Sequence, residues 1–303
     1  MDSMTTDAVL QLPDHRPLER TDKALLDSVF EEFAPQTSEL TFTNLFAWSG
    51  THQVHLARVD RTVLLWRGPD KKGVLLSPLG PLEREGIASA LAWAQSMGGP
   101  PEFGRLSEQD ADRLIEADPG LSKFEDRDNA DYVYRVRDLV ELQGRAYDGK
   151  RNQIKKFNRA VEAAYVPIDR VIVQKCLAMQ DCWCDARECS IHADLDAEDR
   201  AVKIMLNHYD ELGLIGGALV AGEEVVAFSL AEPLSPDTAV VHVEKADPGV
   251  PGAYQAINRE FCANALAGFE FVNREQDLGV EGLRRAKMSY HPDHLVIKYT
   301  VRR

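Results

Sequence analysis

The order of secondary-structure elements repeats along this 303-residue chain, and the repetition limits the fold more than any single motif does. In the first half, hydrophobic spacing predicts a helix over residues 22–33, a hairpin over 54–66, a strand over 74–80, helices over 86–97 and 107–117, and a strand over 132–136. From residue 145 it predicts helices over 147–163, 170–186, 196–212, 252–266 and 282–288, a hairpin over 214–230, and strands over 164–168, 238–244, 269–273 and 295–301. We therefore predict an α/β (α+β) fold of mixed, mostly antiparallel sheets flanked by helices, present twice, in domains 1–143 and 144–303.

Composition narrows the class of protein. Hydrophobic residues make up 44% and charged residues 28% of the chain, which excludes a disordered or collagen-like protein. No apolar run approaches the ~18 residues of a membrane-spanning helix, and residues 1–20 lack the apolar core of a secretory signal. We expect a cytoplasmic protein without a transmembrane segment, and the sequence favours no oligomeric state. Walker, nucleophile-elbow and dinucleotide-binding motifs are absent, so kinase, hydrolase and dehydrogenase functions lack support.

The charge is distributed unevenly along the chain. The 35 Lys and Arg against 49 Asp and Glu give 35 − 49 = −14, which disfavours binding to nucleic acid or anionic membrane over the whole surface. Between residues 145 and 159, however, six cations stand against one anion. Lys150, Arg151, Asn152 and Lys155 in this helix are candidate substrate-binding residues for phosphate on tRNA, a lipid headgroup or a nucleotide. The alternative is an ordinary solvated helix face.

Four of the five cysteines lie between residues 176 and 189. Cys182, Cys184 and Cys189 with His192 have the residue types of a zinc site, but two sulfurs two residues apart on one helix point in different directions. We therefore predict no metal. We expect reduced thiols packed beside Trp183 rather than a disulfide framework.

Six motifs resemble those of an uncharacterised bacterial family related to the C-terminal domain of phosphatidylglycerol lysyltransferase. They are DLVELQG at 138–144, KRNQIKKF at 150–157, LIGGAL at 214–219, VEKAD at 243–247, VNREQDLG at 272–279 and LRRAKMSYHP at 283–292. The resemblance covers the chain from about residue 39. It implies two tandem GNAT-like acyltransferase domains, akin to the Fem-type transferases that take amino acids from aminoacyl-tRNA.

The same resemblance implies an activity. The expected reaction passes an amino acid from aminoacyl-tRNA, the cosubstrate, to an amine or hydroxyl acceptor. One alternative is a non-catalytic binding protein for a phosphate-bearing ligand, which is a nucleotide, tRNA or a lipid headgroup. Another is an acyl-CoA N-acyltransferase. No cofactor beyond the acyl donor is expected.

The segment DPGVPGAYQA at 247–256 corresponds to the loop that holds the pyrophosphate of acetyl-CoA in GNAT enzymes. Backbone N–H groups at a helix start bind phosphate, and glycine permits its approach. Gly249, Gly252 and Tyr254 occupy the aligned positions, but the basic residue and the second small residue are missing. These three residues are candidates for cofactor binding, and the incomplete loop disfavours acetyl-CoA. The alternative is a plain turn and helix start.

The strand over residues 238–244 supplies the candidate general base. Simple alternation places Val240, His242 and Glu244 on one face. Glu244 is the first choice, because a partly buried carboxylate can take a proton from an attacking amine, and His242 is the second. The alternative is a strand-end ion pair and a hydrogen-bonded core histidine.

Polar residues are dense after the strand over 269–273, where a GNAT-like fold opens toward its ligand. By the resemblance, Lys287 stabilises an oxyanion or a phosphate, and Ser289 and Tyr290 line the acyl site. Asn273 and Arg274 are candidate substrate-binding residues. The alternative is a structural network around the helix at 282–288.

Overall fold

The computed structural model describes residues 9–68 and 73–303. The chain forms two compact units, the first comprising Met1–Asp131 and Val296–Arg303 and the second Tyr132–Leu295. The chain passes from one unit to the other within strand β6 (Ser122–Arg135) and again within strand β12 (His294–Arg302). The boundaries of the compact units therefore differ from the predicted boundary between residues 143 and 144. The division into two repeated domains, 1–143 and 144–303, stays a prediction. The segment 1–20, which lacks the apolar core of a secretory signal, lies partly outside the described residues.

Unit 1 is built on a mostly antiparallel sheet. Its strand order is β1-β2-β3-β4-β5-β12, in which only β4 and β5 are parallel. Its other elements are β1 (Arg16–Pro17), α1 (Lys23–Phe33), α2 (Phe42–Ala47), β2 (Val54–Val59), β3 (Thr62–Arg67), β4 (Val74–Leu75), α3 (Arg84–Ser96), β5 (Glu102–Leu106) and α4 (Glu108–Ala117).

Burial of apolar side chains explains this sheet, and β3 is buried at five of its six positions. Strands β2 and β3 are joined by a two-residue turn at which Asp60 takes a left-handed conformation, which Asp tolerates better than bulky residues. Trp66 and Phe103 from the strands pack with Ile87 and Trp93 of α3, and all four are buried. Burial of these large side chains is the main favourable term in folding this unit.

Unit 2 carries the second sheet, in the order β6-β11-β10-β9-β8-β7. Every neighbouring pair is antiparallel except β10 and β11. Its other elements are α5 (Val136–Glu141), α6 (Asp148–Ala160), β7 (Ala164–Pro167), α7 (Arg170–Arg187), α8 (Ala193–Asn207), α9 (Tyr209–Leu212), β8 (Ile215–Ala221), β9 (Glu224–Pro233), β10 (Thr238–Ala246), α10 (Ala253–Asn264), β11 (Phe271–Asn273) and α11 (Glu281–Met288).

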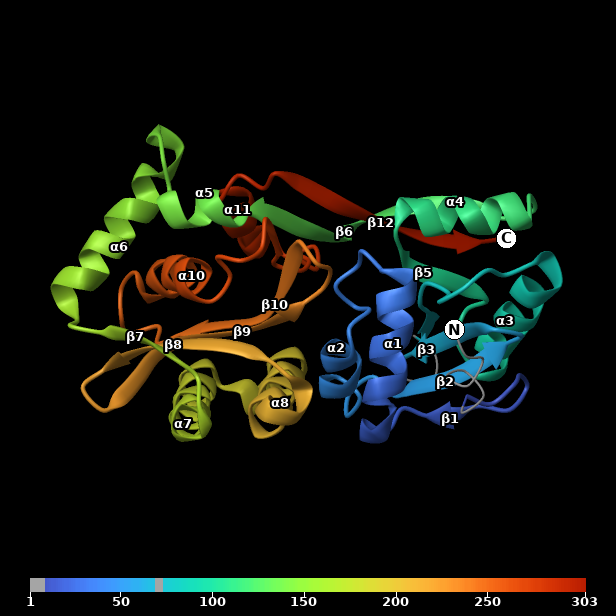
Figure 1. The fold of residues 1–303 in the computed structure, drawn as a ribbon, viewed down its shortest axis with the longest axis horizontal. Coiled ribbons are helices and arrows are strands. Elements are labelled where there is room, and N and C mark those ends of the chain that lie inside the picture. Colours follow the sequence, from blue (N-terminus) through green and yellow to red (C-terminus); the bar gives the residue numbers. More distant parts are fainter. Residues whose placement is uncertain (1–8, 69–72) are drawn as a thin grey trace. The chain divides into compact units, whose positions relative to one another are not determined.

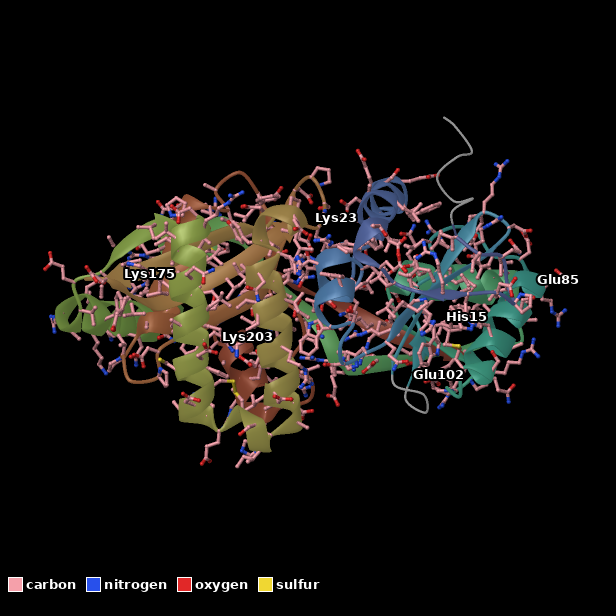
Figure 2. All side chains as sticks on the ribbon, turned by 90° about the horizontal axis from the view of Figure 1, so that it is seen from below. His15, Lys23, Glu85, Glu102, Lys175 and Lys203 are labelled. Carbon is pink, nitrogen blue, oxygen red and sulfur yellow. A yellow bond between two sulfur atoms is a disulfide. The ribbon has the colours of Figure 1, made fainter. Side chains whose placement is uncertain are left out.

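The sheet of unit 2 is covered by helices on both faces. Helix α10 lies on one face, and α7 and α8 lie on the other (Figure 1). Helix α7 begins at Asp169, whose carboxylate accepts hydrogen bonds from the backbone N–H groups of Val171 and Ile172. Helices α7 and α8 run side by side, with Lys175 on the first and Lys203 on the second (Figure 2). The inner face of α10 is apolar apart from Asn258, which is 3% exposed.

The predicted fold class is confirmed. Both units have mixed sheets that are mostly antiparallel and flanked by helices, and the elements of each half follow the predicted order. Four elements, β1, α2, β5 and α5, were not predicted from the sequence. Two predicted elements differ in length, because β6 begins ten residues before the predicted 132 and β4 keeps only two residues. In the described part of the chain, no helix combines the length and apolarity needed to cross a bilayer.

Candidate functional site

Strand β10 leaves its parallel neighbour halfway along its length. The register of β10 with β11 runs from Thr238 opposite Phe271 to Val240 opposite Asn273, whereas β10 continues to Ala246. Beyond Val240, β10 has no hydrogen-bonded strand among the described residues on this side, and side chains of the segment that begins at Arg274 contact it instead. Arg274 and Glu275 of this segment contact Glu244 and His242 of β10, respectively.

A β-bulge in β10 decides which way Glu244 points. The register with β9 shifts between Val241 and Val243, so that His242 is the extra residue. The shift reverses the alternation, and Glu244 faces α10 while His242 contacts Glu232 on the other face. The prediction that His242 and Glu244 share a face is therefore wrong, because a bulge of one residue is invisible in a simple period of two.

Glu244 is held by two neighbours. One carboxylate oxygen accepts a hydrogen bond from Nη2 of Arg274 at 2.8 Å, and the other accepts one from Nδ2 of Asn258 at 2.9 Å. The Glu244 and Arg274 side chains are each only 14% exposed. Burial alone would lower the pKa of Arg274, but the charge of Glu244 and the nearby tyrosines raise it above its ordinary value, so the guanidinium stays charged.

Three buried polar atoms around this ion pair have no hydrogen-bond partner among the described residues. They are Nη1 of Arg274, Oδ1 of Asn258 and Oγ of Ser229, which lies opposite Glu244 in the β9–β10 register. A buried donor or acceptor without a partner is costly, and most buried polar groups in folded proteins are paired. The cluster thus offers two donors and one acceptor beside a carboxylate, which complements a small ligand that carries both a carbonyl oxygen and an N–H or O–H group.

Aromatic rings and a lysine adjoin the pair. The guanidinium of Arg274 lies 5.0 Å from the ring centre of Tyr290 and 5.6 Å from that of Tyr134. Lys150 of α6 places Nζ 3.8 Å from the Tyr290 ring centre and donates a hydrogen bond of 2.6 Å to Oγ of Ser289. Burial and the charge of Arg274 lower the pKa of Lys150, and burial raises the pKa of Tyr134 and of Tyr290. Both phenols therefore stay neutral at physiological pH.

A pocket of about 370 Å³ opens beside these residues. It is lined by Ala146, Gly149, Lys150, Gln153, Gln255 and Ser289. Lys150 is the one charged residue of this lining, and the side chain of Gln255 forms a hydrogen bond with Tyr290. Lys150, Ser289 and Tyr290, three predicted site residues that are far apart in the sequence, thus meet at one place.

His242 is less suitable as a base than the sequence suggested. Its Nε2 lies 2.8 Å from the Glu232 carboxylate and its Nδ1 lies 2.9 Å from that of Glu275. Burial opposes the charge of His242, but the two carboxylates raise its pKa to about 10. An imidazolium with both N–H groups bonded has no lone pair to accept a proton, so we interpret His242 as a structural cation.

Lys287 and Asn273 hold the chain after β11. The Lys287 amine donates to the backbone carbonyls of Arg274 and Glu275, and the Asn273 side-chain oxygen accepts from the backbone N–H of Glu275 at 2.8 Å. Glu275 has a positive φ of 54°, a conformation that such bonds stabilise. Lys287 thereby fixes the backbone of Arg274, and the bonds that its amine forms are to the protein's own backbone carbonyls.

The four predicted residues of the basic helix α6 have different surroundings. Arg151 donates to the backbone carbonyl of Leu142 and to the Asp148 carboxylate, which ties α6 to the end of α5. Asn152 and Lys155 are exposed to solvent. Of the four predicted residues on this helix, Lys150 is the one that lines the pocket.

Gly252 has a steric role at the start of α10. It has a φ of +83°, and a Cβ at this position would lie 2.2 Å from the backbone oxygen of Gln153 in α6. The α6 backbone therefore covers the glycine that GNAT enzymes present to pyrophosphate. Gly249 donates its N–H to Asp247 at 2.7 Å, and the Tyr254 hydroxyl accepts from Nε1 of Trp183 at 3.1 Å. These contacts suit a turn and helix start, and they disfavour a phosphate cradle at this place.

Three residues near the pair were not predicted from the sequence: Asn258, Gln255 and Tyr134. Gln255 and Asn258 are one helical turn apart on α10, and Asn258 is the polar interruption of an otherwise apolar buried face. This polar residue on an apolar helix face was the sequence signal that could have identified Asn258 as a site residue. Tyr134 donates its hydroxyl to the backbone carbonyl of Lys287, a contact over 153 positions that no local pattern indicates.

The cysteines correct another prediction. Cys184 and Cys189 form a disulfide, with Cα atoms 5.1 Å apart, whereas Cys176, Cys182 and Cys262 are free thiols. Helix α7 ends at Arg187, and Glu188 turns the chain back in a left-handed conformation, which brings Cys189 over the last turn. Spacing along an unbroken helix cannot show this reversal. Within residues 9–68 and 73–303, no group of three or more His, Cys, Asp or Glu side chains is arranged to hold a metal ion.

Comparison with known proteins defines the family. The family described as "Phosphatidylglycerol lysyltransferase, C-terminal" matches residues 30–302, and the chain belongs to it. Family and fold together support an acyltransferase. The search of curated proteins gave no match.

Two solved structures illustrate the likeness. A conserved protein of unknown function from Bacteroides thetaiotaomicron superimposes with a TM-score of 0.86 at 29% identity, covering 95% of this chain and 98% of that one. The structure of L-PGS from Bacillus licheniformis gives a TM-score of 0.62 at 14% identity, covering 97% of this chain and 93% of that one. At such low identity the second match shows the fold alone.

Proposed function

We propose that this protein transfers an amino acid from aminoacyl-tRNA to an amine or hydroxyl acceptor, with the reaction at Glu244 and Arg274 in unit 2. The observation that carries the proposal is the cluster of three unpartnered buried polar atoms around this ion pair. The description of the family, which names a lysyltransferase acting on phosphatidylglycerol, supports an aminoacyl donor and a hydroxyl-bearing lipid acceptor. Charged tRNA places the reaction in the cytoplasm.

The chemistry is an acyl transfer. The acceptor N–H or O–H attacks the ester carbonyl of the aminoacyl group, its proton passes to Glu244, and a tetrahedral oxyanion forms. Arg274 stabilises the oxyanion through Nη1, while its Nη2 keeps Glu244 in place. The carbon–oxygen bond to the ribose then breaks, and the ribose oxygen takes the proton that Glu244 received. Asn258 Oδ1 is available to accept a bond from the α-ammonium of the donor.

Gly252 supports tRNA over acyl-CoA as the donor. The Gln153 carbonyl lies where a side chain at Gly252 would have to be, so a pyrophosphate bound in the GNAT manner has no room there. Lys150 and Ser289 in the pocket supply a cation and a hydroxyl for a phosphate of tRNA or of a lipid headgroup.

One observation favours the second candidate, a non-catalytic binding protein for tRNA or a phosphate-bearing small molecule. Tyr290 is only 6% exposed, and its ring adjoins both the Lys150 amine, which lines the pocket, and the Arg274 guanidinium of the ion pair. In the binding protein this ring is a fixed wall. In the enzyme it moves when the donor binds.

The test uses the purified protein with a pool of charged tRNAs and, separately, with acyl-CoAs. We expect release of amino acid from tRNA that depends on an added acceptor, and no release of free CoA. A protein that binds tRNA without deacylating it supports the second candidate. Deacylation of acyl-CoA alone contradicts the choice of donor.

A further inference from the structure

Exposed apolar side chains gather on one segment of unit 2. Of the nine large apolar side chains that are exposed in the described residues, four lie between residues 278 and 288. They are Leu278 at 61% exposure, Val280 at 55%, Leu283 at 39% and Met288 at 45%, and we call them the apolar tip. Scattered exposed hydrophobic residues are ordinary, but a concentration in eleven consecutive positions marks an interaction surface.

The apolar tip is held rigidly by polar contacts beneath it. Helix α11 has no buried residue, yet Arg284 binds the Asp277 carboxylate at 2.8 Å and Lys287 binds two backbone carbonyls. Leu278 has a positive φ of 55°, which is costly for a bulky residue. The sequence therefore keeps an exposed leucine in an unfavourable conformation and anchors the helix that follows it, which indicates a preformed surface rather than a loose loop.

The charge of this segment differs from that of the chain. Residues 278–291 contain Arg284, Arg285 and Lys287 against one carboxylate, Glu281, in a chain of net charge −14. Arg285 is 75% exposed, and its ion pair with Glu281 is a long one of 3.7 Å between exposed side chains. Apolar side chains next to a cation match a bilayer surface, where acyl chains lie beneath anionic phosphates. A protein partner with a hydrophobic groove has no need for that flanking charge.

The apolar tip is adjacent in sequence to residues of the pocket. Met288 is followed directly by Ser289, which lines the pocket, and by Tyr290, which adjoins Arg274. A bilayer that receives the tip would bring its headgroups to the rim of the pocket, near the Lys150 amine.

We propose that the apolar tip, Leu278, Val280, Leu283 and Met288, inserts into the interfacial layer of a phospholipid bilayer and docks unit 2 there, with Arg285 at the level of the lipid phosphates. Docking is peripheral and reversible, because only a few side chains enter the membrane. It requires neither the donor nor turnover.

Vesicle co-sedimentation of the full chain tests this docking. The vesicles contain phosphatidylcholine alone or phosphatidylcholine mixed with phosphatidylglycerol, and no tRNA is added. We expect binding to both, stronger to the anionic vesicles. The variant Leu278→Ser/Val280→Ser/Leu283→Ser should lose binding by at least about a hundredfold, since each buried Val or Leu side chain contributes roughly tenfold or more in partitioning. Arg285→Glu should weaken binding to the anionic vesicles only.

The matched control is Val171→Ser/Ile191→Ser, which removes two exposed apolar side chains elsewhere in unit 2, at 65% and 70% exposure. It should bind as the unchanged protein does, and all variants should keep the same thermal midpoint. Equal binding by the tip variant, or no binding of the unchanged protein to either vesicle, overturns the proposal. So does a dimer that the tip variant converts to a monomer, since the tip would then be a self-association surface. The deacylation assay with a soluble acceptor is independent of all these outcomes.

Discussion

Two clusters of buried charge, one in each unit, differ in how completely their polar atoms are paired. In unit 1, Lys298 has no exposed side-chain surface and binds Glu39 at 2.6 Å and Asp131 at 2.7 Å, while Ser38 donates to Asp131. One atom of this cluster, Oε1 of Glu39, has no hydrogen bond to a described residue, and it lies 3.7 Å from Nε of Arg105. In unit 2, the Glu244–Arg274 pair is surrounded by three unpartnered polar atoms and adjoins a pocket. A buried cation between two carboxylates is the arrangement of a structural network, whereas unpaired donors beside an ion pair suit a ligand.

The unit 1 cluster also has a different electrostatic balance. Burial would raise the pKa of Glu39, but Lys298 and Arg105 lower it below its ordinary value, so the carboxylate is charged within the protein interior. Removal of the lysine takes away the cation that binds both buried carboxylates and leaves Glu39 with the more distant Arg105. The two clusters therefore predict opposite consequences: loss of stability in unit 1 and loss of activity in unit 2.

The largest expected effect is on stability. Lys298→Met should lower the free energy of unfolding by about 3–5 kcal/mol, because it removes the cation that binds the buried Glu39 and Asp131 carboxylates directly. Chemical denaturation of the variant measures this loss. Exposed Lys155→Met is the control and should change stability little. A Lys298→Met protein as stable as the unchanged one would show that the unit 1 cluster is not structural.

The next effect is on activity. Arg274→Lys keeps the charge beside Glu244 but loses the fork that bonds with both Nη atoms, and we expect transfer to fall by about a hundredfold or more. Single-turnover deacylation of charged tRNA measures the change. Arg170→Lys, at the exposed start of α7, should have full activity. If the two variants behave alike, Arg274 has no contact with the reacting groups.

Stability should also depend on pH through His242. Its pKa is raised from 6.5 to about 10 in the folded protein, so its contribution is complete below pH 6.5 and is lost as the pH rises toward about 10. Denaturation midpoints measured across this range should fall more steeply for the unchanged protein than for His242→Gln. Parallel slopes would mean that the histidine is neutral between Glu232 and Glu275.

The smallest expected effect is a difference in KM between substitutions of two lysines of α6. Lys150→Met removes the amine that contacts Ser289 and Tyr290, and a charge-assisted hydrogen bond of this kind is worth roughly tenfold in KM. Lys155→Met, on the exposed side, should change KM much less. Equal effects of the two substitutions would restore the predicted basic stripe as one ligand surface.

The sequence predicted elements better than contacts. Most helices and strands of unit 2 follow from the hydrophobic period, although α5 was not predicted. Glu244 was chosen from its place on a strand, and Ser289 and Tyr290 were assigned to the acyl site through the family resemblance. The bulge at His242 escaped prediction because one inserted residue changes the face without changing the composition.

Long-range contacts account for the other differences. Asn258 contacts Glu244 only because α10 packs on β10. Lys287 donates to a backbone carbonyl, a contact that the charge pattern of the sequence does not indicate. The Cys184–Cys189 disulfide depends on the left-handed turn at Glu188. Each of these features rests on tertiary geometry rather than on local pattern.

The central claim is that Glu244 accepts a proton during aminoacyl transfer. Acceptor-dependent deacylation of charged tRNA by Glu244→Gln, compared with the exposed control Glu223→Gln, tests it most directly, because the substitution keeps the size of the side chain and one accepting oxygen but removes the basic carboxylate. We expect a loss of about a hundredfold or more in the rate of transfer for Glu244→Gln, with tRNA binding retained and with Glu223→Gln unaffected. Equal rates for the two variants would contradict the claim.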